Sequence, residues 1–156
     1  MILVTVGTTM PFEELLAEVD RLAGAGYFAE DVVCQSGQST YAMAHAKQFI
    51  GTDIGAFAEM IASSSVVISH GGATVVQLLL ARKPFVAFPN PRGAGDHQAS
   101  FLRRIAAVAD ISWSPHVADL AGLIRERLTK GPASVQLDFP RIHTEILRFV
   151  GQIRLP

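Results

Sequence analysis

The sequence is poor in cysteine and has no long apolar run. Cys34 is the single cysteine among 156 residues, which excludes an internal disulfide and a metal cluster built from thiolates. Because no run of about 18 apolar residues occurs, no segment is expected to span a bilayer. The first nine residues, MILVTVGTT, lack the basic region and small-residue cleavage site of a signal peptide. We therefore expect a soluble, cytoplasmic protein.

Positive charge is not in excess. The chain has 13 Lys and Arg against 14 Asp and Glu, a formal net charge of −1, whereas proteins that bind a nucleic-acid duplex usually carry a basic excess or stripe. Nucleic acid is therefore not an expected partner. Charged residues make up 17% of the chain, and the mean hydropathy is +0.32. Two explanations stay open: a parallel sheet covered on both faces, and an exposed apolar face that binds a partner.

Apolar segments of strand length alternate with segments of helical period. Strands are expected at residues 2–6, 31–35, 47–50, 66–69, 84–88 and 111–113. Helices are expected at residues 11–24, around 57–61, and at 75–82, 97–108, 117–128 and 140–152. This alternation predicts parallel βαβ units with right-handed crossovers. The length suits one domain, so residues 1–156 are expected to form a single α/β domain with a doubly wound parallel sheet.

Ligands of such a sheet bind beyond the carboxyl ends of the strands, where residues 69–74 (SHGGAT) form the first candidate loop. Gly71 and Gly72 allow the backbone to approach a ligand, and the following helix offers unpaired N–H groups to an anion such as a diphosphate. Thr74 is placed to cap that helix or to donate its hydroxyl to the anion. His70 offers a further donor. A tight turn with Thr74 as a plain N-cap remains the alternative.

The loop after the first strand is a second candidate for binding an anion. Gly7 is followed there by the hydroxyls of Thr8 and Thr9, and Pro11 suits the first turn of a helix. The alternative is a capping turn with Thr9 as the N-cap. Neither GxGxxG after this strand nor GxxxxGK[ST] anywhere occurs, so a Rossmann dinucleotide fingerprint and a P-loop are absent.

The third candidate loop places Asp96, His97 and Gln98 at a helix start. An acceptor and an amide side by side suit the vicinal hydroxyls of a sugar, and Asp96 as a simple N-cap is the alternative. His70, Asp96 and His97 are metal-ligating residue types, but no HxxxH or HxH spacing occurs and no metal is expected. A serine hydrolase is not expected either, because no GxSxG elbow is found.

Motifs from separate parts of the chain occur together in one known family. They are residues 4–9 (VTVGTT), 35–39 (QSGQS), 69–72 (SHGG) and 96–98 (DHQ). Over residues 2–150 the chain resembles the C-terminal, donor-binding half of family 28 GT-B glycosyltransferases. It is most similar to the stand-alone catalytic subunit of the split N-acetylglucosaminyltransferase of dolichol-linked glycan assembly, and to bacterial counterparts in exopolysaccharide synthesis. The resemblance implies a Rossmann-like half of a GT-B architecture and a UDP-sugar donor, with no metal or other cofactor.

The resemblance also implies roles for the loop residues. The diphosphate is expected to contact His70, Gly71, Gly72 and Thr74. The phosphates or the cleft mouth are expected to face Gly7, Thr8 and Thr9. The donor sugar is expected to contact Asp96, His97 and Gln98. His70 is the predicted catalytic residue, because together with the helix dipole it offsets charge that grows on the β-phosphate.

Two departures from the family pattern bear on activity. The usual loop is HGGAGT, whereas this chain has HGGAT. The acidic residue that binds the ribose hydroxyls in the family falls on Gln77, and hydrogen bonds to a charged group are roughly twice as strong as those to a neutral one. Donor affinity is therefore expected to be reduced, or the nucleotide to bind differently. A non-catalytic regulatory or scaffold subunit, and a single-domain nucleotide-binding protein, remain alternatives.

A GT-B enzyme needs two domains, and the resemblance assigns only the donor half to this chain. It implies a membrane-anchored, acceptor-binding glycosyltransferase subunit as partner and a lipid-linked sugar as acceptor. The partner is expected to hold the chain at the inner face of a membrane and to supply the general base. The apolar residues between 142 and 155 either form a docking helix or pack on their own domain.

Overall fold

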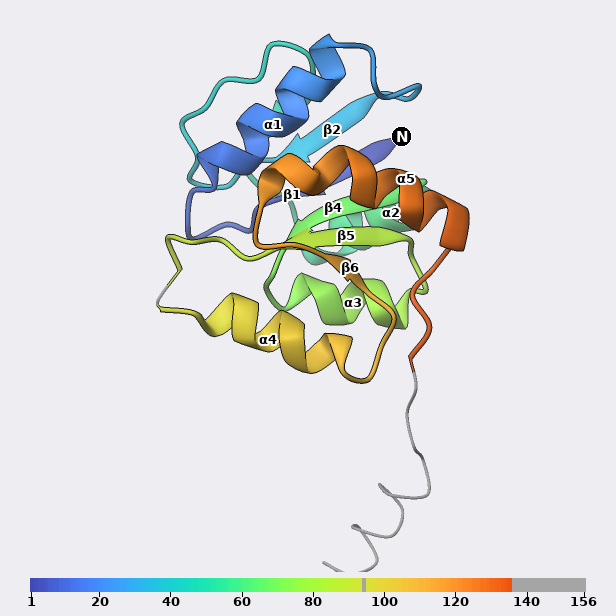
Figure 1. The fold of residues 1–156 in the computed structure, drawn as a ribbon. Helices are drawn as coiled ribbons and strands as arrows, with labels where there is room; N and C mark the ends of the chain where they lie inside the picture. The colour runs from blue at the N-terminus through green and yellow to red at the C-terminus, as the bar shows by residue number, and fades with distance from the viewer. Residues whose placement is uncertain (94, 136–156) are drawn as a thin grey trace, which may run out of the picture.

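A parallel sheet of six strands forms the middle layer of this computed structural model, which describes residues 1–93 and 95–135 (Figure 1). The order across the sheet is β3-β2-β1-β4-β5-β6. The strands are β1 (Ile2–Thr5), β2 (Val32–Gln35), β3 (Lys47–Phe49), β4 (Val66–His70), β5 (Phe85–Phe88) and β6 (Ser112–Trp113). The doubly wound α/β fold is confirmed, and each strand lies within one residue of its predicted bounds.

Helices cover both faces of the sheet (Figure 1). They are α1 (Glu13–Gly24), α2 (Ile54–Ser63), α3 (Thr74–Leu80), α4 (His97–Ala106), the short 3-10 helix η1 (Val117–Asp119) and α5 (Leu120–Lys130). In Figure 1, α1 and α5 lie on one side, and α3 and α4 on the other. In the two described ranges, no helix combines the length and apolar character needed to cross a membrane. The helix predicted at 140–152 lies outside the described residues.

The central strands are apolar on both faces because both faces are covered. Ile2 and Val4 pack in a core with α1 and α5, whereas Leu3 between them packs in a second core with residues of α2, α3 and α4. All three side chains are buried. Successive strand residues point to opposite faces, so the central strands β1, β4 and β5 are apolar along most of their length, whereas Lys47 and Gln48 of the edge strand β3 are exposed. The covered sheet contributes to the low charged fraction of the sequence.

Two predicted helix starts are wrong. We expected a helix from Pro11 with Thr9 as a possible N-cap, but α1 begins at Glu13 after Phe12, without a side-chain cap. Phe12 is buried, and its N–H donates to Ser39 Oγ at 3.0 Å. The start of α1 is therefore fixed by a contact with a residue distant in sequence. Thr74 is not an N-cap either: it is the first residue of α3, and no side chain caps that helix.

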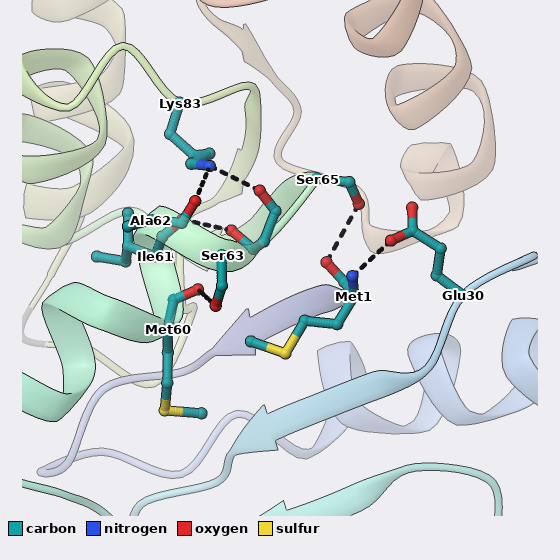
Figure 2. Close-up of polar contacts among 9 residues, drawn as sticks. Met1, Glu30, Met60, Ile61, Ala62, Ser63, Ser65 and Lys83 are labelled. Carbon is teal, nitrogen blue, oxygen red and sulfur yellow. Dashed lines mark hydrogen bonds and ion pairs between the residues drawn. The ribbon is translucent and has the colours of Figure 1, made fainter.

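The amino ends of the strands are closed by polar contacts (Figure 2). Lys83 Nζ donates to the carbonyl oxygens of Ala62 at 2.8 Å and Ser64 at 2.6 Å. These bonds satisfy carbonyl groups at the C-terminus of α2, where a cation is also favoured by the helix dipole. Beside them, Ser65 Oγ donates to the Met1 carbonyl at 3.1 Å, and the Met1 ammonium pairs with Glu30.

The connection between β2 and β3 contains no helix, and carboxylates of α1 hold it in place. Glu13 accepts the N–H groups of Thr40 and Tyr41 at 2.9 and 3.0 Å. Asp20 accepts the N–H groups of Ala44 and His45 at 3.1 and 2.7 Å. Burial alone raises the pKa of Asp20, but these two N–H groups, with the His45 and Tyr41 side chains, outweigh it and lower the pKa.

Candidate functional site

The loops after β1 and β4 open beside each other at the carboxyl ends of the strands. The strand order reverses at β1, which pairs with β2 on one side and β4 on the other. In open α/β sheets ligands bind at such a switch point. Thr5 pairs in register with Ser69, so Gly7 and His70 come together although far apart in sequence.

The imidazole of His70 lies between two glycines. A β-carbon on Gly7 would lie 3.0 Å from both Cε1 and Nε2 of His70, and one on Gly72 would collide with Nε2. Gly7 also has φ +80°, a conformation that other residues rarely adopt. Both positions therefore require glycine. The structure brings Gly7, His70 and Gly72 together, as a shared site requires.

The hydrogen bond of His70 defines its tautomer. Nδ1 lies 3.4 Å from the carbonyl oxygen of Thr5, which can only accept, so Nδ1 carries the hydrogen and the neutral ring has its lone pair at Nε2. Burial lowers the pKa of His70, and the bond to Thr5 offsets this only in part. The imidazole is therefore neutral at about pH 7, with Nε2 directed at Gly72.

The last residues of β1 and β2, at the carboxyl edge of the sheet, have polar side chains. Thr5 Oγ1 donates to Gln35 Oε1 at 2.7 Å, and both side chains are buried. With the contact between Thr5 and His70, this bond links β2, β1 and β4 in one row. The loop after β2 joins them at Gly37, which has φ +55° and packs so closely on the Gly7 carbonyl that a β-carbon would collide with it. Three loops thus meet at Gly7.

The loop after β4 presents free backbone donors. Gly71 N–H donates to the Phe88 carbonyl at 2.7 Å, and the N–H groups of Val75 and Val76 donate within the turn. Within residues 1–93 and 95–135, the N–H groups of Gly72, Ala73 and Thr74 have no protein acceptor. Consecutive unpaired N–H groups at a helix start favour an anionic group.

Gln98 joins the loop before α4 to this site. Its Oε1 accepts the N–H of Asn90 at 2.8 Å, which leaves its amide nitrogen as a donor. A β-carbon on Gly71 would lie 3.2 Å from the Cβ of Gln98. Asn90, which is buried, in turn donates to the Pro11 carbonyl at 2.9 Å. Sequence reasoning missed Asn90, which ties this loop to the entry of α1.

Asp96 and His97 lie on the exposed part of the same loop. Asp96 occupies the N-cap position of α4, but its side chain makes no capping bond there. It accepts instead from Arg103 at 2.8 Å, and this hydrogen bond is the main reason why the pKa of Asp96 is lowered. In the part of the chain that the structure describes, neither residue hydrogen-bonds to the loops after β1 or β4.

A cavity of about 300 Å³ opens between α2 and α3. It is lined by Gln35, Thr52, Asp53, Ile54, Phe57, Ala58, Ile61, Gln77 and Ala81. The cavity contains Gln77, the position where the resemblance places a ribose contact, and Gln35 connects it to Thr5 and His70. Thr52, Asp53 and Phe57 were not among the predicted site residues. The signal that could have identified them in the sequence is Asp53, a typical N-cap residue, directly after Thr52.

The remaining predicted residues lie at the same edge of the sheet. Thr8 and Thr9 are exposed on the loop after Gly7, and Thr8 Cγ2 would lie 3.7 Å from a β-carbon on Gly51. No three His, Cys, Asp or Glu side chains come together to hold a metal ion within the described ranges. The site therefore offers glycine-lined backbone donors, hydroxyls, one neutral imidazole and an adjacent cavity.

Comparison with known proteins matches this architecture. The sequence model described as "Glycosyltransferase family 28 C-terminal domain" matches residues 1–108, which include every loop discussed above. No curated protein matches the sequence. The NMR solution structure of ALG13 has a TM-score of 0.57 and 19% identity, over 90% of this chain and 93% of that one. The crystal structure of MurG from Acinetobacter baumannii has a TM-score of 0.51 and 21% identity, over 83% of this chain and 44% of that one. These structures share the fold.

Proposed function

The chain belongs to the glycosyltransferase family 28 C-terminal domains, as its motifs predicted, and from this we propose that it is the donor-binding catalytic subunit of a two-component glycosyltransferase. It transfers a sugar from a UDP-sugar to a lipid-linked acceptor in glycan or polysaccharide assembly. One observation carries the proposal. His70 is enclosed between Gly7 and Gly72 beside three unpaired N–H groups, an arrangement suited to a diphosphate.

The donor lies across the carboxyl edge of the sheet in this proposal. The diphosphate accepts from the N–H groups of Gly72 and Thr74, with Gly71 allowing the close approach. The nucleoside enters the cavity that Gln77 lines. No metal is needed, because backbone donors and hydroxyls bind the diphosphate charge. α3 has only seven residues, so these local N–H groups contribute more than an extended helix dipole.

Other predicted residues surround the phosphates and the sugar. Thr8 and Thr9 present their hydroxyls to the phosphates. The free amide nitrogen of Gln98 donates to a sugar hydroxyl, while its oxygen remains bonded to Asn90. Asp96 and His97 contact the donor sugar from the exposed part of the loop. Contact by Asp96 then competes with its bond to Arg103.

His70 acts on the leaving group. A diphosphate brings negative charge to the buried imidazole, and an opposite charge nearby favours the protonated form. Nε2 then takes up a proton and donates to the β-phosphate. The acceptor hydroxyl attacks the anomeric carbon, the bond from that carbon to the β-phosphate oxygen breaks, and its electron pair remains on that oxygen. The imidazolium and the backbone N–H groups stabilise this charge.

The acceptor half of the enzyme comes from a partner in this proposal. The chain covers 44% of the length of MurG but 93% of the length of ALG13. The part that it shares with MurG is therefore less than half of that protein. We assign the lipid-linked acceptor, the membrane anchor and the general base to a second glycosyltransferase subunit. That partner holds this chain at the cytoplasmic membrane face.

Calorimetric titration with nucleotides and sugar nucleotides, beginning with UDP and UDP-N-acetylglucosamine, tests donor binding. We expect saturable binding that is weakened by His70→Ala and unchanged by His116→Ala, a control at an exposed histidine outside the site. A transfer assay with the reconstituted partner tests catalysis. If neither the chain nor the complex bound a nucleotide, the enzyme proposal would be wrong and a scaffold role would remain.

A further inference from the structure

The cavity between α2 and α3 contains one carboxylate among its described lining residues, that of Asp53. Its other polar side chains are those of Gln35, Thr52 and Gln77, which are neutral. Gln35 Oε1 is already bonded to Thr5, so this residue offers the cavity its amide donors. The strongest hydrogen-bond acceptor available to a ligand in this cavity is therefore Asp53.

Asp53 is held in place by the helix that it begins. It is the N-cap of α2, and its Oδ1 accepts the N–H of Ala56 at 2.9 Å. In the described ranges Oδ2 has no protein donor. A carboxylate fixed through one oxygen binds a ligand through the other with little further loss of side-chain freedom. The capping bond thus makes Asp53 a preorganised acceptor.

We propose that Asp53 recognises the ribose of the donor nucleotide, an inference that rests on the proposed function. Ribose presents two neighbouring hydroxyls, each able to donate, and a carboxylate is an acceptor-only group. Gln77 on the opposite helix can accept through its oxygen, but as a neutral amide it binds more weakly. The carboxylate that selects ribose in this chain therefore lies at the start of α2, and the amide on α3 assists it.

The variant Asp53→Asn tests this role without removing the helix cap, because Asn and Asp are about equally good N-caps. We expect it to bind UDP about tenfold more weakly, since a charge-assisted hydrogen bond becomes a neutral one. Binding of 2′,3′-dideoxy-UDP, which lacks both hydroxyls, should be the same for the wild type and Asp53→Asn. Glu59→Gln is the matched control, an exposed carboxylate on α2 outside the cavity, and should leave both affinities unchanged.

The outcomes separate this inference from the proposed function. If the wild type binds UDP and Asp53→Asn binds it equally well, Asp53 does not recognise ribose, while donor binding stands. Equal weakening of UDP and its dideoxy analogue would place the carboxylate at another part of the nucleotide and overturn the inference. If Gln77→Ala lost the preference for UDP over its dideoxy analogue and Asp53→Asn kept it, Gln77 on α3 would be the residue that recognises ribose, and the inference would be wrong. Failure of both the wild-type chain and its complex with the partner to bind any nucleotide would overturn both proposals.

Discussion

The Nε2 atom of His70 lies so close to Gly72 that a β-carbon there would collide with it. The loop after β4 therefore folds back onto the last residue of its own strand. Nδ1 on the other side of the ring contacts Thr5, 65 residues earlier in the chain. The imidazole thus sets the spacing between two loops in addition to its proposed role toward the donor.

Gly72→Ala should destabilise the protein through this contact. We expect a loss of about 1–3 kcal/mol, the usual cost of overpacking, and a much smaller loss when His70→Ala has already removed the ring. Urea unfolding of the two single variants and the double variant measures the coupling. Gly122→Ala is the control, because nothing lies within 4 Å of a β-carbon at that position. Additive effects of the two site substitutions would contradict the contact.

The protonation of His70 should depend on the nucleotide. In the free protein the ring is neutral at pH 7 with hydrogen on Nδ1, because burial lowers its pKa and Thr5 accepts from Nδ1. Bound UDP should raise this pKa, since negative charge favours the imidazolium. Nuclear magnetic resonance titration of the ring, with and without UDP, measures both values. An unchanged pKa in the complex would contradict the proposal that Nε2 donates a hydrogen bond to the β-phosphate.

The same residue makes stability depend on pH. The folded-state pKa of His70 lies below its unfolded value of 6.5, so its contribution is fully present above about pH 6.5. As the pH falls below this value, the unfolded chain binds a proton that the folded chain binds only at lower pH. Wild-type stability should therefore fall between pH 7.5 and 5.5 more steeply than that of His70→Gln. Parallel slopes in urea unfolding would contradict this.

Asp20→Ala should make the connection between β2 and β3 more mobile around residues 44 and 45. The substitution removes the hydrogen bonds that the N–H groups of Ala44 and His45 donate to a charged carboxylate, which together contribute about 2 kcal/mol. Because the folded-state pKa of Asp20 is lowered, this contribution is present above the unfolded pKa of about 3.8 and is lost as the pH falls through the folded value. Hydrogen exchange at residues 44 and 45 reports this mobility. Glu18→Ala, which removes an exposed pair with Arg21, should not change it.

Arg127→Met should destabilise the protein without altering the site. The fully buried guanidinium donates to Ser112 Oγ at 3.0 Å and to the Asp110 carbonyl at 2.7 Å. Loss of these bonds takes the charged donor away from the buried Ser112 hydroxyl and from the Asp110 carbonyl, which costs about 3 kcal/mol. The melting temperature should fall, while UDP affinity of the folded protein stays the same. Arg125→Met, at an exposed position of the same helix, serves as the control and should melt like the wild type.

Sequence reasoning located the site loops because local signals define them. The spacing of apolar residues predicts the strands, and the glycines that follow them predict the loops at the strand ends. Local signals say nothing about partners distant in the chain, so the enclosure of His70 by Gly7 was out of reach until β1 and β4 were paired. Of the two roles expected for Thr74, that of a helix cap is wrong for a local reason. The turn at Gly72 closes through backbone bonds, and the threonine falls inside the helix.

The cavity was harder to predict because two helices build it together. Asp53 is recognisable from sequence as an N-cap, and Gln77 as a position on the next helix. Only the packing of α2 beside α3 makes them walls of one space. For Asp96, by contrast, Arg103 lies seven residues later, about two helical turns away. That pairing was within reach of sequence analysis, although we did not predict it.

The connection between β2 and β3 has a consequence for variation on the outer surface. Since it lacks a helix, its position depends on the α1 carboxylates that hold it, Glu13 and Asp20. Gly37, the second residue of the same connection, packs on the Gly7 carbonyl. A change of charge on α1 can therefore shift the loop after β1 without touching any residue of the proposed donor site. If the proposed function holds, natural or engineered variants of α1 tune the affinity for the donor from a distance.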